Sequence, residues 1–294
     1  MTRDLVGYGG AWPDFAWPNG ARLAVSVVVN FEEGAEQQVI DGDPANELIG
    51  EVISVVPEGK PDPGQAQIFA YGMRAGAWRV ARALRMRAML ATIFACGRAA
   101  ERAAPVLAML AGDGHEVACH GWLWRPHADY DNPDAEAADL ERAAAAIVVA
   151  TDKAPKGFFC RGAESPWTRQ LLAERGYVYT SNSFDDDLPY RDPSGLMVVP
   201  YALDANDMKF FHPNGFVRAS EMVEYVADAL DVLEAEASAG LPRLLNIGFH
   251  LRIVGRPGRF KAFEGVLDEL ARRRDRLWIA RRIDIARAFA KAVP

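Results

Sequence analysis

The chain has 294 residues, 50% hydrophobic and 25% charged, which is enough for one large α/β domain. A net charge of −7 argues against nucleic acid as a partner, because binding a phosphate backbone needs a positive surface. No apolar run approaches the roughly 20 residues that cross a bilayer, and three widely spaced cysteines form no disulfide framework. With no apolar signal segment after Met1, we expect a cytoplasmic protein without a membrane partner.

The first part of the chain is predicted to be an extended arm followed by a buried strand. Residues 1–21 are rich in glycine, proline and aromatic side chains and show no helical period. The next stretch, 22–36, is RLAVSVVVNFEEGAE, a Val-rich run that is typical of a strand buried on both faces. It ends at Glu32 and Glu33 before Gly34, which allows a sharp turn. The two carboxylates are either a solvated strand end or part of a site, since α/β folds keep their chemistry at this end of the strands.

A long irregular segment is predicted to follow, over about 37–72. Connections longer than about 12–15 residues are usually functional lids or binding loops. This one leaves from the carboxylate end of the strand, so we expect it to cover or wall the site.

The rest of the chain alternates between helix and strand patterns. We expect helices near 74–85, 99–111, 134–150, 165–176, 221–239 and 260–274, and strands near 89–95, 116–120, 157–161, 177–181, 197–201, 244–250 and 277–280. Repeated β–α units indicate a parallel sheet, here with enough strands to close a barrel. No linker interrupts the pattern, so we expect a single domain over 1–294.

Three of these strands end in a titratable side chain on their smaller, more polar face. Residues i and i+2 of a strand share a face, so Glu32 lies with Asn30, and His250 lies with Gly248 and Asn246. His120 lies with Ala118 in the same way. Because a narrow barrel favours small side chains inside, these residues should meet at one mouth.

Arg161 ends a fourth strand and could join this group. A carboxylate can take a proton from water, an imidazole can protonate a leaving nitrogen, and a guanidinium can hold an anion or an oxyanion. The pattern therefore indicates hydrolysis of a carbonyl compound. Cys119 and Cys160 should face the helices as small buried hydrophobes rather than act as nucleophiles.

Several segments resemble motifs of the polysaccharide deacetylase family, along almost the whole chain. They are Asn30-Phe31-Glu32-Glu33-Gly34, Gly114-His115-Glu116 through His120, Arg161, Leu203-Asp204-Ala205-Asn206-Asp207 and Phe249-His250. Asp4 to Gly9, the Asn-Phe-Glu-Glu-Gly form itself, Leu203 to Met208 and Val254-Gly255-Arg256-Pro257 look closest to the allantoinase-like branch. The resemblance implies a distorted (β/α) TIM-like barrel of about seven to eight strands.

The resemblance also bears on a metal cofactor. Metal-dependent members hold a divalent ion with the second acid of the first motif and two histidines, and the matching positions here are Glu33, His120 and Trp124. An indole cannot replace an imidazole as a ligand. No cofactor is therefore expected; if a divalent metal such as zinc binds, Glu33 and His120 are the candidate ligands.

The site residues follow from these motifs. Glu32, Glu33, His120 and His250 are the expected catalytic residues. Glu32 or Glu33 should activate water, with Glu32 favoured because the resemblance gives the first acid that role, and His250 should be the general acid. The expected substrate-binding residues are Arg161, Trp124, Asn206 and Asp207.

Three functions stay open from the sequence. The first is hydrolysis of a non-peptide C–N bond, with opening of a cyclic ureide such as allantoin. The second is metal-dependent N-deacetylation of an acetylated sugar or polysaccharide, and the third is a catalytically inactive barrel that binds a ligand. In each case the partner is a small molecule, and the resemblance implies a homo-oligomer.

Overall fold

The computed structural model describes residues 4–52 and 54–293, and its strands form one nine-stranded sheet. The strands are β1 (Leu23–Phe31), β2 (Thr92–Ala95), β3 (Glu116–Cys119), β4 (Gly157–Phe158), β5 (Tyr179–Thr180), β6 (Tyr190–Arg191), β7 (Met197–Val198), β8 (Arg243–His250) and β9 (Leu277–Ile279). Their order is β6-β7-β5-β4-β3-β2-β1-β8, with β9 also paired to β1. All pairs are parallel except β6 with β7. The sheet curls into the half-barrel that the sequence predicts.

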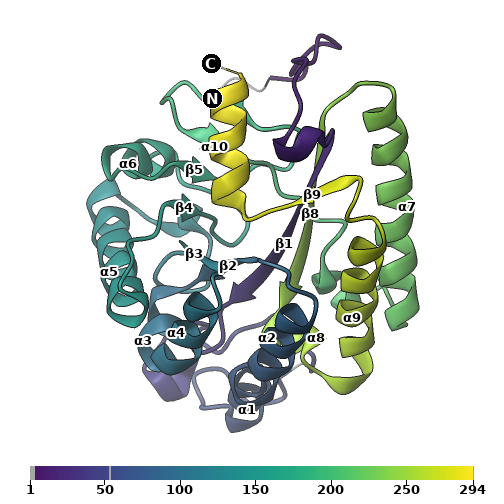
Figure 1. Cartoon of the computed structure of the whole chain (residues 1–294). Coiled ribbons are helices and arrows are strands. Elements are labelled where there is room, and N and C mark those ends of the chain that lie inside the picture. Colours follow the sequence, from purple (N-terminus) through teal and green to yellow (C-terminus); the bar gives the residue numbers. More distant parts are fainter. Residues whose placement is uncertain (1–3, 53, 294) are drawn as a thin grey trace.

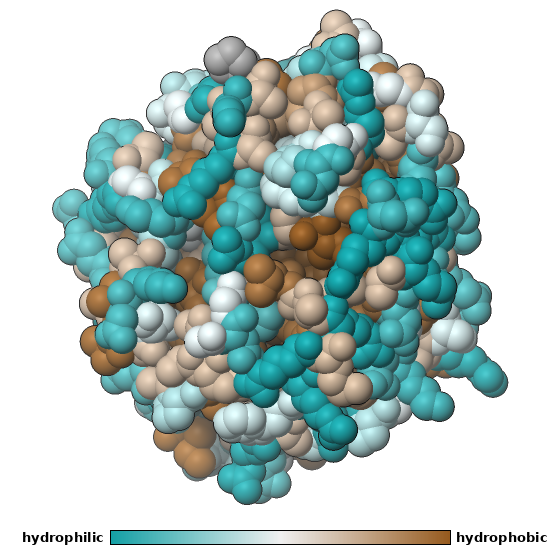
Figure 2. Space-filling view, in the orientation of Figure 1, coloured by the Kyte–Doolittle hydropathy of each residue, from teal (hydrophilic) through white to brown (hydrophobic). Residues whose placement is uncertain are grey.

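Helices cover the outside of this sheet (Figure 1). They are α1 (Pro63–Tyr71), α2 (Ala77–Met86), α3 (Gly97–Arg102), α4 (Ala104–Gly112), α5 (Pro133–Thr151), α6 (Thr168–Glu174), α7 (Ala219–Ser238), α8 (Leu251–Val254), α9 (Pro257–Arg272) and α10 (Arg282–Ala292). A π-helical turn, Gly72–Gly76, joins α1 to α2. Figure 2 shows a largely hydrophilic face in this view, with apolar side chains visible in a hollow near its centre. None of the helices in the described ranges has the length and apolar character needed to span a membrane.

Strand β1 pairs with three strands, β2, β8 and β9, and is buried along its whole length. Val25, Val27 and Val29 pack in the cluster beneath the helices, whereas Ala24 and Val28 belong to the cluster inside the barrel. Asn30 of β1 is level with His250 of β8. The alternation read from the sequence is thus present, and it brings the polar ends of β1 and β8 to the same height.

The two ends of the barrel are different. At the end where β1 begins, the arm lies beside α10 (Figure 1). Phe15 and Trp17 of the arm pack against Phe289 of α10, and the Phe15 and Trp17 ring centroids are 4.8 Å apart. The Trp17 indole N–H donates to the Arg243 carbonyl over 3.0 Å. Apolar side chains thus close this end of the barrel, and the polar residues lie at the opposite end, where β1 finishes.

The irregular segment after β1 is shorter than predicted, because α1 already begins at Pro63. Asp62 caps this helix by accepting the Gln65 amide N–H at 3.0 Å, and proline occupies the first turn, where its missing N–H costs nothing. The short strand β6 and the one-turn helix α8 were not predicted, since two to four residues carry no periodic signal. The connection without regular α-helix therefore covers roughly residues 32–62.

Candidate active site

The ends of β1, β3 and β8 bring Glu32, His120 and His250 into direct contact. A Glu32 carboxylate oxygen lies 3.1 Å from Nε2 of His120 and 3.3 Å from Nε2 of His250. All three side chains are buried, Glu32 and His120 at 1% and His250 at 5% exposure. This is the convergence that the strand alternation predicts.

Asp207 holds the ring of His250 from the other side. One Asp207 oxygen is 2.6 Å from Nδ1 of His250, and the other accepts the His250 backbone N–H at 2.8 Å. Asp207 begins the 3-10 helix Asp207–Phe211 and is fully buried. A carboxylate at Nδ1 fixes the orientation of the ring and leaves Nε2 facing Glu32.

Arg252 is the cation beside the two glutamates. Its Nη1 lies 2.6 Å from a Glu32 oxygen and 3.6 Å from a Glu33 oxygen. Its backbone N–H donates to the same Glu33 oxygen at 2.8 Å. Gly72 makes room for Glu33, because a Cβ at that position would lie 2.7 Å from the Glu33 carboxyl carbon.

These contacts separate the proton affinities of Glu32 and His250. Burial alone would raise the pKa of Glu32, but the charges of His250 and Arg252 and the hydrogen bonds from both histidines bring it well below 4.5. Burial alone would lower the pKa of His250, but the Glu32 and Asp207 carboxylates raise it to about 9. The pair is therefore a carboxylate facing an imidazolium near neutral pH.

The neighbouring carboxyls behave in the opposite way. Burial raises the pKa of Glu33 despite the opposing effect of Arg252. Burial likewise raises the pKa of Glu36 to about 7. Of the acids after β1, Glu32 is the one whose surroundings favour a permanent negative charge.

Aromatic rings form the floor of the site. His120 stacks on Phe159 with centroids 5.1 Å apart, and Phe159 stacks on Tyr201 at 4.4 Å. The Tyr201 hydroxyl accepts the amide of Asn30 at 3.3 Å and that of Asn206 at 3.0 Å. The stack fixes the plane of the His120 ring, whose Nδ1 contacts the Phe159 carbonyl.

The segment after β1 is tied down next to the site. Glu47 forms a two-point ion pair with Arg161, at 2.8 and 3.1 Å, and is only 6% exposed. The Arg161 guanidinium lies 3.9 Å from the Trp124 ring centroid. Arg98 also binds both oxygens of Asp43, at 2.9 and 2.8 Å.

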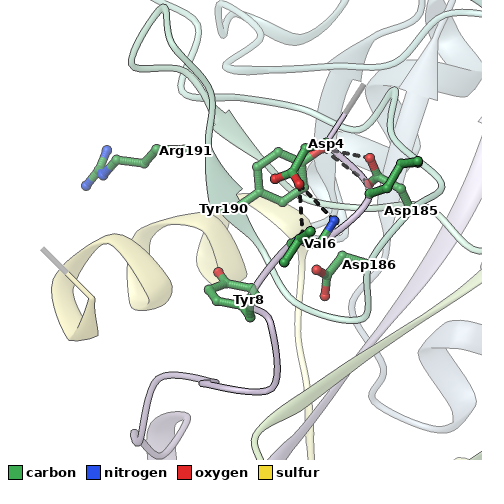
Figure 3. A pocket seen from close by; sticks show the side chains of 9 residues that line it. Asp4, Val6, Tyr8, Asp185, Asp186, Tyr190 and Arg191 are labelled. Carbon is green, nitrogen blue, oxygen red and sulfur yellow. Dashed lines mark hydrogen bonds between the residues drawn. The ribbon is translucent and has the colours of Figure 1, made fainter. Parts of the chain in front are cut away.

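A cavity of about 500 Å³ lies away from this cluster. It is lined by Asp4 to Tyr8 of the arm together with Asp185, Asp186, Tyr190 and Arg191. Figure 3 shows these side chains around the arm, with Asp4 accepting the Val6 amide N–H. The cluster around Glu32 is closed over, so we identify the site by its chemistry and not by its volume.

Comparison with known proteins identifies the family of this chain. A family model described as polysaccharide deacetylase matches residues 59–180. A Schizosaccharomyces pombe protein assigned to the polysaccharide deacetylases is 31% identical over 319 aligned positions, covering 100% of this chain and 98% of that protein. The chain belongs to the polysaccharide deacetylase family.

Two solved structures of this family match over the full length. One is a probable polysaccharide deacetylase from Pseudomonas aeruginosa PAO1, 37% identical with a TM-score of 0.93, covering 100% of this chain and 99% of that chain. The other is the PuuE allantoinase, 36% identical with a TM-score of 0.93 and the same coverage. The fold, a curled (β/α) barrel, is that of these relatives.

A divalent metal occurs in the wider deacetylase family, so we tested whether these residues fit one. Among residues 4–52 and 54–293, no group of three or more His, Cys, Asp and Glu side chains is placed to hold an ion. Glu33 is bound by Arg252, His120 is directed at Glu32, and the third position is the Trp124 indole. The donor set does not fit a metal site.

The other expected site residues lie nearby in different roles. We expect Asp207 at the substrate from the sequence, but both its oxygens are bound to His250. Asn206 caps the 3-10 helix by accepting the Met208 N–H at 2.8 Å. Arg161 and Trp124 lie against each other beside Glu47.

Sequence reasoning missed Arg252 and Glu47. Arg252 could have been found as the basic residue two positions after the strand-ending His250. Glu47 has no such signal, because its partner Arg161 is 114 positions away in the chain. The cysteines behave as predicted, since Cys119 and Cys160 are fully buried in the cluster beneath the helices.

Proposed function

We propose that this deacetylase-family protein hydrolyses a non-peptide C–N bond and opens a cyclic ureide such as allantoin. The observation that carries the proposal is the contact between Glu32 and His250, a base and an acid whose pKa values lie on opposite sides of neutrality. Two such groups facing one another are typical of general acid–base catalysis. An inactive binding barrel has no need of this pair.

In the proposed reaction, Glu32 takes a proton from water as the water oxygen bonds to the ring carbonyl carbon. When the C–N bond breaks, the leaving nitrogen takes the proton on Nε2 of His250. Asp207 orients the His250 ring through both steps and favours its charged form until the C–N bond breaks. The product is a ureido-carboxylate, and the proton held by Glu32 returns His250 to its starting state.

A cyclic ureide suits this site better than an acetylated sugar. A carboxylate with a lowered pKa is a weak base, so it needs an electrophilic carbonyl and a good leaving nitrogen. The imide-like carbonyl of a ureide ring provides both. The full-length similarity to the PuuE allantoinase supports the same substrate class. We also propose that the protein is a cytoplasmic homo-oligomer.

The experiment compares turnover of allantoin with release of acetate from N-acetylated chitin oligosaccharides. We expect ring opening of the ureide, and Glu32→Gln and His250→Gln should each lower kcat by about 10²–10⁴-fold. His212→Gln, at an exposed loop position, is the matched control and should retain activity. Acetate release without ureide turnover would replace the proposal with the deacetylase function.

A further inference from the structure

The feature that needs explaining is a pair of adjacent carboxyl groups buried beside one arginine. Glu32 is 1% exposed and Glu33 is 2% exposed. A buried carboxylate is very unfavourable unless a positive charge or several hydrogen bonds compensate for it. Arg252 supplies both, since Nη1 binds Glu32 and its backbone N–H binds Glu33.

Two aromatic rings hold the Arg252 guanidinium in place. Its central carbon lies 4.5 Å from the Trp124 ring centroid and 4.8 Å from that of Phe69 in α1. Both distances are within the range of a cation–π contact, and such contacts strengthen when water is excluded. Arg252 itself is 2% exposed, so this contact is a dry one.

The backbone around Arg252 is also built for close approach. A Cβ at Gly76 of the π-helical turn would lie 2.2 Å from the Leu251 carbonyl oxygen, and one at Gly255 would lie equally close to it. Only glycine therefore lets the turn press against α8, which carries Arg252. Single π-helical turns of this kind occur often at functional sites.

Part of the guanidinium remains unused. Within the described residues, Nε and Nη2 of Arg252 are buried without a hydrogen-bond partner. Buried donors are normally satisfied, and an unsatisfied pair next to a general base is a place where a ligand oxygen would be stabilised. This observation separates Arg252 from a purely structural arginine.

We propose that Arg252, packed against Trp124, is the resident cation beside the catalytic carboxylate: its guanidinium binds and orients Glu32, in a donor set that does not fit a metal ion. Trp124 and Arg252 then form one unit, because an indole face at this position binds a guanidinium where an imidazole would bind a metal. The role of Glu32 as base rests on the proposed function, but the state of its carboxyl can be measured without substrate.

The test follows the Glu32 carboxyl by carbon-13 NMR in protein labelled at the glutamate side-chain carboxyls. The resonance that disappears in Glu32→Gln is assigned to Glu32. In the wild type it should stay at the ionised position throughout the folded pH range. In Arg252→Ala its titration should move up by at least about one pH unit, which corresponds to a tenfold change in proton affinity. Millimolar methylguanidinium should reverse that shift, whereas methylammonium should not.

Arg273→Ala is the matched control, because Arg273 is also a buried, ion-paired arginine but lies just after α9, paired with Glu269 of α9 and Asp231 of α7. It should leave the Glu32 resonance unchanged. If Arg252→Ala does not fold, Arg252→Lys keeps a charge without the planar stack and should still shift the titration. An unchanged Glu32 titration in a folded Arg252 variant overturns the proposal.

Activity provides the second readout. Arg252→Ala should lower kcat by about 10²-fold or more with KM changed only a few-fold, and methylguanidinium should restore part of it. A loss that the cation does not rescue indicates a merely structural residue. If the wild type opens no ureide, the proposed function fails, while the carboxyl titration still decides the role of Arg252.

Discussion

The positive charge of the His250 ring is stabilised by two carboxylates, which approach its opposite nitrogens. Asp207 is 2.6 Å from Nδ1, and Glu32 is 3.3 Å from Nε2. Together they outweigh the desolvation of the imidazolium and raise its pKa from 6.5 to about 9. The residue is thus charged under neutral conditions although it is buried, which is what a general acid requires.

A pH profile should show this directly. With Glu32 ionised and His250 protonated, kcat/KM should be high near neutrality and fall as the pH rises through about 9. Asp207→Asn removes one of the two anions, so the alkaline limb should move to lower pH. Asp204→Asn, an exposed neighbour in the same segment, should leave the limb in place. An alkaline limb that does not move in Asp207→Asn would contradict the role given to Asp207.

The same pair affects stability with a defined sign. The folded state binds the His250 proton more tightly than an unfolded chain does. The contribution of His250 to the free energy of unfolding is therefore full below about pH 6.5 and is lost as the pH rises through about 9. The contribution of Glu32, whose pKa is lowered in the folded state, is present at neutral pH and is lost only in acid. Both contributions are present together near neutrality.

For single residues, the sequence predicted the direction of a side chain only where the residue ends a strand. Period-two alternation placed Glu32, His120 and His250 on one face, since each ends a buried strand. It could not assign Asp207, because a loop residue has no face until the chain around it is placed. Arg252 was missed for the same reason, as it lies in a helix of only four residues.

At the scale of elements, three ion pairs tie the connection after β1 to the rest of the barrel. Glu47 pairs with Arg161, Asp43 with Arg98, and Asp41 with Arg102. The catalytic side chains are buried, and we expect this connection to cover them and to move when a substrate enters. Lids of this type often control access and product release.

Glu47→Gln should loosen the connection without disturbing the barrel. The amide cannot form the charged two-point contact with Arg161, so KM should rise several-fold while the unfolding transition shifts little. Hydrogen exchange should become faster in residues 37–52. Asp41→Asn, which breaks a more exposed pair, serves as the control. Unchanged exchange and KM would show that the ion pair does not govern closure.

The helices show where local rules were enough. The helix predicted near 134–150 is α5, which begins with an Asn132 cap followed by Pro133; Asn132 accepts the Ala135 N–H at 2.9 Å. The same pairing of a capping residue with a following proline occurs at Asp62-Pro63 and predicts the start of α1, which lies within the segment 37–72 that we expected to be irregular. The strands predicted near 157–161, 177–181 and 197–201 have only two residues each in the structure.

At the scale of the whole molecule, a buried arginine links the two free edges of the curled sheet. Arg282 at the start of α10 is fully buried and donates to Ser26 and Asn246 on β1 and β8, at 3.0 and 2.7 Å. It also donates to Ser181 after β5 and to the Pro200 carbonyl after β7, at 2.8 and 2.7 Å. One side chain thus connects strands that do not pair with each other. Burial lowers the pKa of Arg282 to about 10.

Arg282→Met should therefore destabilise the barrel strongly. Several buried acceptors would lose their donor at once, and we expect a loss of about 3 kcal/mol in the free energy of unfolding. Urea denaturation followed by circular dichroism would measure it. Arg287→Met, on an exposed position of the same helix, should change the stability by less than about 0.5 kcal/mol. Equal stabilities of the two variants would contradict the view that Arg282 holds these strands together.

The overall architecture was predictable because its pattern of helices and strands is repeated along the chain. The contacts that Arg282 makes between the strands could not be predicted. Alternating helices and strands indicate a parallel barrel whatever the details of each unit. Nothing in the residues around Arg282 shows that its side chain turns inward. That depends on how far the sheet curls, which is a property of all the strands together.

The buried thiols have a practical consequence for spectroscopy. Cys96, Cys119 and Cys160 are fully buried, and burial raises the pKa of each thiol. Maleimide reagents attack exposed thiolates, so the native protein should remain unlabelled without any cysteine being removed. A single cysteine introduced at the exposed position Leu48, beside Glu47, would then carry a fluorophore alone. Opening of the connection could be timed in an otherwise unaltered chain, turnover by turnover.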